Sequence, residues 1–143
     1  MPGSDSTTLR LLAMDEDDLA VISAALQDAV AKVGDIAYEP RERRLTIVFN
    51  RYRWESGGGE RVRSALQLGG VSLLQARRIR RGARQAVVEL LSVHFEVGDA
   101  PSGSVVISFA GGGDLRAEVE CIDAILADIS TPWPTRSEPA HET

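Results

Sequence analysis

Residues 44–68 read RLTIVFNRYRWESGGGERVRSALQL, and this stretch decides the fold. Its first part, Arg44–Trp54, alternates apolar and polar residues, which is typical of a half-buried β-strand. The run SGGG at 56–59 favours a hairpin loop, and Arg61–Leu68 resumes the alternation beyond it. The apolar phase slips by one residue around Asn50, and we expect a β-bulge to absorb that slip.

The segment before this hairpin predicts a strand followed by a helix. Thr8–Met14 is a short apolar run, and we expect it to form a strand. Apolar residues then recur three and four positions apart, which predicts a helix over Glu16–Val33. Asp15 suits the N-cap, and acidic residues favour the positive end of the helix dipole. Capping therefore explains the run Asp15–Asp18 better than a metal site, whose ligands must converge from several positions.

The chain after the first helix predicts a sheet and a second helix. The expected strands are Ile36–Glu39, Arg44–Trp54, Arg61–Leu68, Val71–Ala76, Ala86–Val97, Ser104–Ala110 and Asp114–Glu120. Their connections are too short for parallel crossovers, so the sheet should be antiparallel. We expect about seven strands to curl into a barrel or a two-layer sandwich in an α+β fold. A short helix is predicted over Cys121–Ile129. Seven antiparallel strands followed by a helix is an order that resembles pleckstrin-homology-like barrels.

Length and composition fit one domain. The chain has 143 residues, 43% of them hydrophobic and 26% charged, which is ordinary globular composition. We expect a disordered tail at 1–7, a single domain at 8–130 and a proline-rich tail at 131–143. A single cysteine allows no disulfide within the chain, and neither a secretory signal nor a membrane-length apolar stretch is visible. The expected location is the cytoplasm, with no membrane association.

Charge is unevenly distributed along the chain. Residues 41–84 hold 12 arginines against 3 glutamates, whereas the rest holds 4 basic and 18 acidic residues. If the hairpin pairs residue 53 with 61 and 51 with 63, four guanidinium groups project outward together. Like charges opposed across strands are destabilising unless an anionic partner neutralises them. The predicted anion- or partner-binding residues are Arg51, Tyr52, Arg53, Trp54, Arg61, Arg63, Arg77, Arg78, Arg80, Arg81 and Arg84.

Two roles remain open for these residues. Aromatic rings among arginines suit stacking on nucleotides, and guanidinium groups suit planar anions. The same arginines could instead form a solvated face that pairs with the chain's own carboxylates or with a second subunit.

The sequence predicts no catalytic residue, metal or cofactor. His94 and His141 are its only histidines, and no hydrolase, zinc or phosphate-loop motif is present. Cys121 is most simply interpreted as a small buried residue, with a reactive thiol as the alternative. The two triple-glycine runs lie between expected strands, where turn geometry explains them.

Several stretches resemble a small uncharacterised family of alphaproteobacterial proteins, a domain of unknown function. They are LRLLAMDEDDLAVISAALQDAVAKVGD, NRYRWE, VHFEVGDAPSG, FAGGGDLRAEVECIDA and PAH, spread over about residues 9–141. The resemblance implies that the genes of this family often lie beside the gene for histidinol dehydrogenase. It implies no catalytic residues.

Three hypotheses follow for the function. The first is a non-enzymatic binding or adaptor domain that holds an anionic partner, an acidic protein or RNA, on an arginine-rich sheet surface. The second is an enzyme or enzyme accessory that acts on a small anionic metabolite, with His94, Cys121 or an arginine in the site. The third is a structural homodimer whose basic and acidic faces meet.

Overall fold

The protein, seen in a computed structural model that describes residues 8–56 and 59–135, is mostly β. In these ranges it has eleven strands, the α-helix α1 (Glu16–Ala25) and two 3-10 turns, η2 (Val33–Asp35) and η3 (Trp54–Ser56). The strands are β1 (Arg10–Ala13), β2 (Val30–Lys32), β3 (Ile36–Glu39), β4 (Arg44–Tyr52), β5 (Glu60–Leu68), β6 (Val71–Arg77), β7 (Val87–Val97), β8 (Gly103–Phe109), β9 (Asp114–Val119), β10 (Ala124–Asp128) and β11 (Trp133–Pro134).

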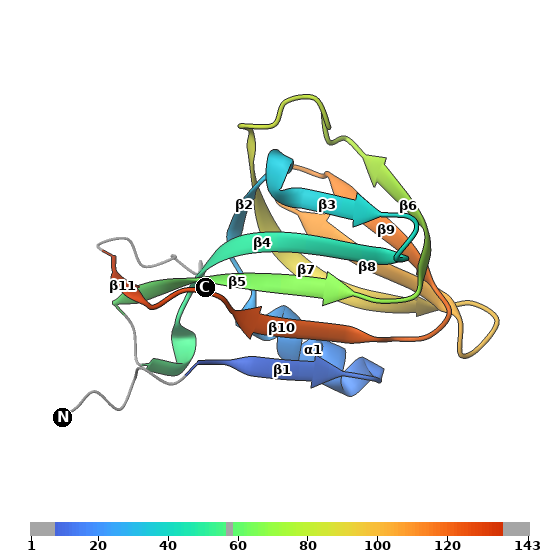
Figure 1. Cartoon of the computed structure of the whole chain (residues 1–143), viewed down its shortest axis with the longest axis horizontal. Coiled ribbons are helices and arrows are strands. Elements are labelled where there is room, and N and C mark those ends of the chain that lie inside the picture. The colour runs from blue at the N-terminus through green and yellow to red at the C-terminus, as the bar shows by residue number, and fades with distance from the viewer. Residues whose placement is uncertain (1–7, 57–58, 136–143) are drawn as a thin grey trace.

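All eleven strands belong to a single open antiparallel sheet. Its order is β1-β10-β5-β4-β2-β7-β8-β9-β6, with β3 added to β4 and β11 added to β5. The sheet bends, so that β4, β5 and β10 lie in front of β7, β8 and β9 (Figure 1). Since β1 and β6 end the order without pairing to each other in the described part of the chain, the predicted barrel or sandwich of about seven strands is wrong. The α+β class and the pleckstrin-homology-like order, with its second helix, are wrong with it.

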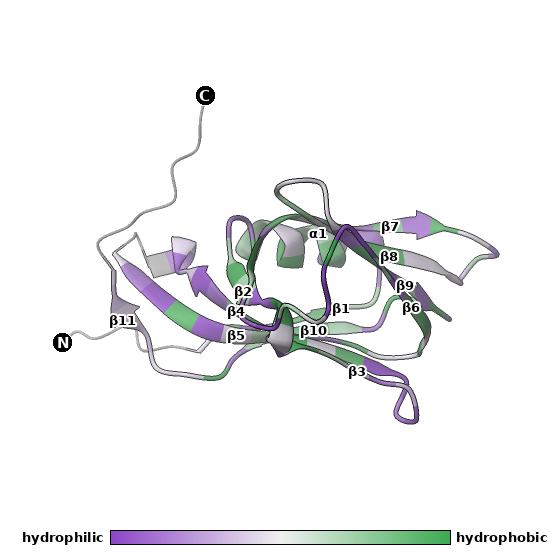
Figure 2. Cartoon of the chain, turned by 90° about the horizontal axis from the view of Figure 1, so that it is seen from above, coloured by the Kyte–Doolittle hydropathy of each residue, from purple (hydrophilic) through white to green (hydrophobic). Residues whose placement is uncertain are grey.

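The two halves of the bent sheet share one hydrophobic core. Ile47 and Phe49 of β4 lie in the same buried cluster as Ile107 and Phe109 of β8. α1 contacts β1 and β7 and adds further buried apolar side chains to this cluster. Alternation places these side chains inward, and Figure 2 shows the same period as purple and green bands along the start of β5. In the described ranges, no helix has both the length and the apolar character needed to cross a membrane.

The first helix is shorter than predicted. Its start is confirmed, because the Asp15 carboxylate accepts a hydrogen bond from the Asp18 N–H at 2.8 Å. It ends at Ala25 rather than Val33, since Asp28 takes a left-handed conformation with φ 65° and its N–H donates to the Leu90 carbonyl. The following residues then pair with β7 as β2. The ladder that β7 offers overrides the helical spacing of the apolar residues.

The predicted helix over Cys121–Ile129 is also wrong. This segment forms β10, which pairs with β1 on one edge and with β5 on the other. Ala124 and Leu126 are buried and their neighbours are not, which is the period of a strand. A run this short fits the period of a helix and that of a strand. The edges of β1 and β5 decide in favour of the strand, because β10 pairs with both.

The central hairpin forms, but in a different register from the predicted one. β4 and β5 pair without interruption from Leu45↔Leu68 to Tyr52↔Arg61, so the bulge predicted near Asn50 is absent from this ladder. The hairpin predicted across Gly111–Gly113 is confirmed as β8 and β9. The predicted tail at 1–7 lies outside the described residues, as does 136–143 of the predicted C-terminal tail, including His141.

Candidate anion-binding site

Arg51 lies inside the protein rather than on its surface. β4 has no bulge after Phe49, so every second side chain continues to point inward. Arg51 takes the next inward position and is 0% exposed. Its guanidinium donates to Asp128 at 2.9 Å, to Glu55 at 2.7 and 3.0 Å and to the Ser64 hydroxyl at 2.9 Å. These partners come from β10, η3 and β5, so the group ties together three separate elements.

The charge of Arg51 is neutralised within the molecule. Burial works to lower the pKa of Arg51, but the hydrogen bonds and charges of Glu55 and Asp128 outweigh it and raise the pKa. Burial likewise works to raise the pKa of Glu55, but the hydrogen bond from Arg51 contributes most to a net lowering. A charged group in a low-dielectric interior requires such partners. Arg51 therefore stabilises the fold, and its buried guanidinium group is not accessible to a ligand.

The residues around Arg51 are engaged in the same way. Arg53 is 2% exposed and forms an ion pair with Glu60, and Glu55 also lies within ion-pair distance. Tyr52 is 2% exposed, its ring lies 4.6 Å from that of Trp54, and its hydroxyl accepts a hydrogen bond from the Gly59 N–H. The expected outward group of four arginines is thus not brought together, because two of its members point inward.

The remaining predicted arginines lie on or near the surface. Arg61 is half-buried, and its guanidinium lies 6.0 Å from the centre of the Tyr52 ring. Arg77 is exposed and pairs with Asp114 at 2.6 Å. The others are exposed and have no ion pair with any described residue: Arg63, Arg78, Arg80, Arg81 and Arg84.

A large irregularity interrupts the sheet beside β4. Between the pairs Ile36↔Ile47 and Val30↔Asn50, residues 31–35 face only residues 48–49 of β4. The excess residues form η2, which bonds to the segment that precedes β7. There the Val33 N–H donates to the Ala86 carbonyl at 2.8 Å, and the Gly34 N–H donates to the Arg84 carbonyl at 2.9 Å. Such extra residues open the ladder and re-aim nearby side chains.

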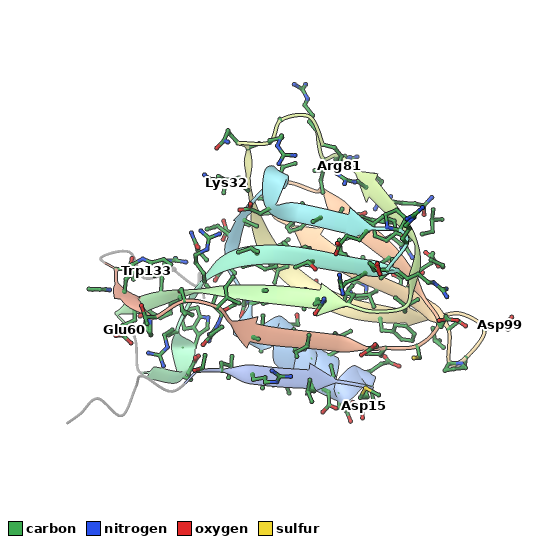
Figure 3. The ribbon with its side chains drawn as sticks, in the orientation of Figure 1. Asp15, Lys32, Glu60, Arg81, Asp99 and Trp133 are labelled. Carbon is green, nitrogen blue, oxygen red and sulfur yellow. The ribbon has the colours of Figure 1, made fainter. Side chains whose placement is uncertain are left out.

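The irregularity opens a hollow of about 340 Å³, which we call the basic hollow. Its polar lining includes Lys32, Asp35, Asn50, Arg63, Arg84 and Gln85. Its aliphatic walls are formed by Val30, Val48 and Val87. Lys32 lies near the upper end of β2, and Arg81 lies in the adjoining β6–β7 loop (Figure 3). The three cations of the hollow come from β2, β5 and this loop, and none has an ion pair with a described residue.

The candidate catalytic side chains lie elsewhere. His94 is exposed and lies 3.4 Å from Glu96, and neither residue lines the basic hollow. Cys121 is exposed, so its interpretation as a buried residue is wrong. Over residues 8–56 and 59–135, no group of three His, Cys, Asp or Glu side chains is placed to hold a metal ion.

The sequence pointed to part of this hollow and missed the rest. Arg63 and Arg84 were among the predicted residues, whereas Lys32, Asp35 and Asn50 were not. Lys32 and Gly34 resembled the end of a helix, so their place in an interrupted ladder was hidden. Gly34 and Asp35 lie just beyond the predicted end of that helix and fit such an end, so they did not reveal the break in the ladder.

These features define a protein with one open antiparallel sheet and a positively charged hollow at a break in that sheet. The chain belongs to the family described as protein of unknown function (DUF2948), which it matches over residues 9–141. Comparison with curated proteins and with solved structures found no match.

Proposed function

We propose that the protein is a non-enzymatic binding or adaptor domain that holds an anionic partner on an arginine-rich surface. This surface combines the cations of the basic hollow with those of the adjoining loop: Lys32, Arg63, Arg84, Arg78, Arg80 and Arg81. The observation that carries the proposal is the contrast between two groups of cations. Arg51, Arg53, Arg77 and Arg116 have carboxylate partners within the chain, whereas the six surface cations have no ion pair with any described residue.

An acidic protein suits this surface better than RNA. Recognition of single-stranded RNA relies on bases that stack on exposed aromatic rings. Of the two rings predicted for that role, Tyr52 is buried under Trp54 and Arg61, and neither Tyr52 nor Trp54 lines the basic hollow. Uncompensated arginines still attract carboxylates through charge and bidentate hydrogen bonds. The expected partner is therefore an acidic protein segment in the cytoplasm.

The other hypotheses have less support. The enzyme hypothesis places His94, Cys121 or an arginine in the site, and both His94 and Cys121 are exposed and lie away from the hollow. A homodimer with complementary faces remains a proposal that light scattering at several salt concentrations tests. The alphaproteobacterial range of the family and the position of its genes beside the histidinol dehydrogenase gene also remain predictions.

Binding of two labelled polyanions, polyglutamate and a single-stranded RNA, tests the proposal by fluorescence anisotropy. We expect polyglutamate to bind at about 50 mM salt and to dissociate as salt rises, because exposed charges are screened. Charge reversal in the variant R80E/R81E should weaken binding at least about tenfold, since like charges then oppose the ligand.

The matched control is R10E/R41E, which makes the same charge change at exposed arginines outside the surface. This variant should bind polyglutamate within about threefold of the parent chain, a difference of under about 1 kcal/mol. Equal losses in both variants would show that net charge alone acts. Absence of binding to either polyanion at low salt would overturn the proposal, and tighter binding of RNA would reverse the choice of partner.

A further inference from the structure

The basic hollow carries more positive charge than its own lining neutralises. Lys32, Arg63 and Arg84 contribute three positive charges, and Asp35 contributes one negative charge. The lining therefore has a net charge of about +2. Since these cations form no ion pair within the described chain, their charge is available to a ligand.

The charge and chemistry of the lining fit one phosphate group. A phosphomonoester carries about −1.5 to −2 charges at pH 7, which matches the excess charge in the hollow. Arg63 and Arg84 offer planar guanidinium groups that bind phosphate oxygens in pairs, and Lys32 adds a compact point charge. The side-chain amides of Asn50 and Gln85 line the same space and are able to donate further hydrogen bonds.

The size of the hollow favours a small molecule. About 340 Å³ lies at the lower end of the range for small-molecule sites. The side chains of Val30, Val48 and Val87 form an apolar wall against which a short carbon skeleton packs. Asp35 places one carboxylate in the lining, which is able to accept a hydrogen bond from a ligand hydroxyl and which repels a second acidic group.

A second hollow on the protein lacks this property although it also contains arginines. It is lined by Arg77, Arg116 and Asp114, together with Gln75 and Ala76. Arg77 pairs with Asp114 at 2.6 Å, and Arg116 pairs with Glu96 at 2.8 Å. Its cations are therefore already neutralised, which leaves the basic hollow as the better anion site of the two.

We propose that the basic hollow binds a small phosphomonoester, with its phosphate held by Arg63, Arg84 and Lys32. The inference rests on the proposed function, because it assigns a ligand class to the innermost part of the same surface. In the intact protein, the phosphomonoester and an acidic partner compete for Arg63 and Arg84. The small ligand then releases the larger one.

Titration with inorganic phosphate and with glycerol 3-phosphate tests the inference, followed by backbone amide NMR shifts of the full chain. We expect saturable shifts around Gly34, Asn50 and Arg84, with a dissociation constant of about 1 mM or tighter. Glycerol should cause no such shifts, and dimethyl phosphate, a monoanion, should bind more weakly than the dianions.

Variants of the hollow separate specific binding from general attraction. Arg63→Gln and Arg84→Gln should each weaken binding about tenfold or more, because each removes a charge-assisted hydrogen bond. Arg80→Gln and Arg81→Gln are matched controls on exposed residues outside the hollow and should have little effect. Asp35→Asn should tighten binding, since it raises the net charge of the lining. Both hollow arginines are exposed, so their variants should retain the fold, which the amide spectrum verifies directly.

The outcomes separate this inference from the proposed function. Binding of polyglutamate without saturable shifts from either phosphate ligand overturns the phosphomonoester site and leaves the proposed function standing. Phosphate binding that the two hollow variants weaken, without polyanion binding, supports the site and overturns the proposed function. Shifts that Arg80→Gln reduces as much as Arg84→Gln would also overturn the site, because they would reflect general attraction to the surface.

Discussion

Substitution of Asp128 by asparagine removes one charge from the buried network while it keeps the shape of the side chain. The Asp128 side chain is 2% exposed, and its carboxylate accepts hydrogen bonds from Arg51, from the Ser64 hydroxyl at 2.6 Å and from the Leu9 N–H at 2.9 Å. Asparagine keeps one acceptor oxygen but presents its amide hydrogens to groups that are themselves donors. Arg51 then faces a neutral partner inside the protein.

The cost follows from the geometry of the pair. At the observed Arg51–Asp128 distance of 2.9 Å, an effective dielectric constant of about 20 gives an attraction of about 6 kcal/mol. Removing one partner of a buried pair costs about 3–5 kcal/mol in practice, because desolvation already offsets part of the attraction. Glu55 remains 2.7 Å from Arg51, so the cation keeps one carboxylate. We therefore expect the Asp128→Asn variant to lose about 3 kcal/mol, the lower end of that range.

Urea denaturation of the parent chain and the variant measures this loss as a change in the free energy of unfolding. Arg116→Gln is the control, since it breaks the solvent-screened Arg116–Glu96 pair and should cost far less than Asp128→Asn. A double-mutant cycle with Arg51→Met should give a coupling energy above about 1 kcal/mol, because the two side chains touch. A loss for Asp128→Asn no larger than that for Arg116→Gln would refute the reasoning.

Two further predictions concern the network and the helix. Because the pKa of Glu55 is lowered from its ordinary 4.5, the unfolded chain takes up the proton first as the solution is acidified. The free energy of unfolding should therefore fall as pH drops below about 4.5 and through the lowered folded pKa, and Glu55→Gln should reduce that slope in acid titrations followed by circular dichroism. Asp15→Ala should cost about 0.5–2 kcal/mol in urea denaturation, because it removes the N-cap acceptor of Asp18 N–H. Asp17→Ala, in the same first turn but without the capping bond, should cost less, and an equal loss would speak against the cap.

Most strands that were predicted from the sequence have a long pattern or lie between turns, and the four-residue strands β1 and β3 were predicted as well. Arg44–Tyr52 alternates over nine residues, and the glycine run at 111–113 marks the β8–β9 turn. Val30–Lys32 and Ala124–Asp128 were assigned to helices, because segments of three and five residues fit either period. Their strand state depends on the edges of β7, β5 and β1, and these partners are distant in the sequence.

The position of Arg51 shows a second limit. The phase slip at Asn50 was visible in the sequence, and a bulge was the local way to explain it. The structure instead keeps the register and buries the arginine, because Asp128 supplies a carboxylate from 77 residues away. A sequence read locally contains no sign of that partner. The exposed arginines Arg78, Arg80, Arg81 and Arg84 have no ion pair with a described residue, and their surface position could be predicted from the Arg77–Gln85 run alone.

The position of β10 has a consequence for how the protein is made. β10 separates the first strand from the middle of the sheet, although it leaves the ribosome after both. Until then β1 has no neighbour among the described strands, and β5 carries an open edge. β1 and β5 are therefore joined only after residues 124–128 have been synthesised, and a nascent chain that stalls before residue 124 exposes two unpaired edges to other chains.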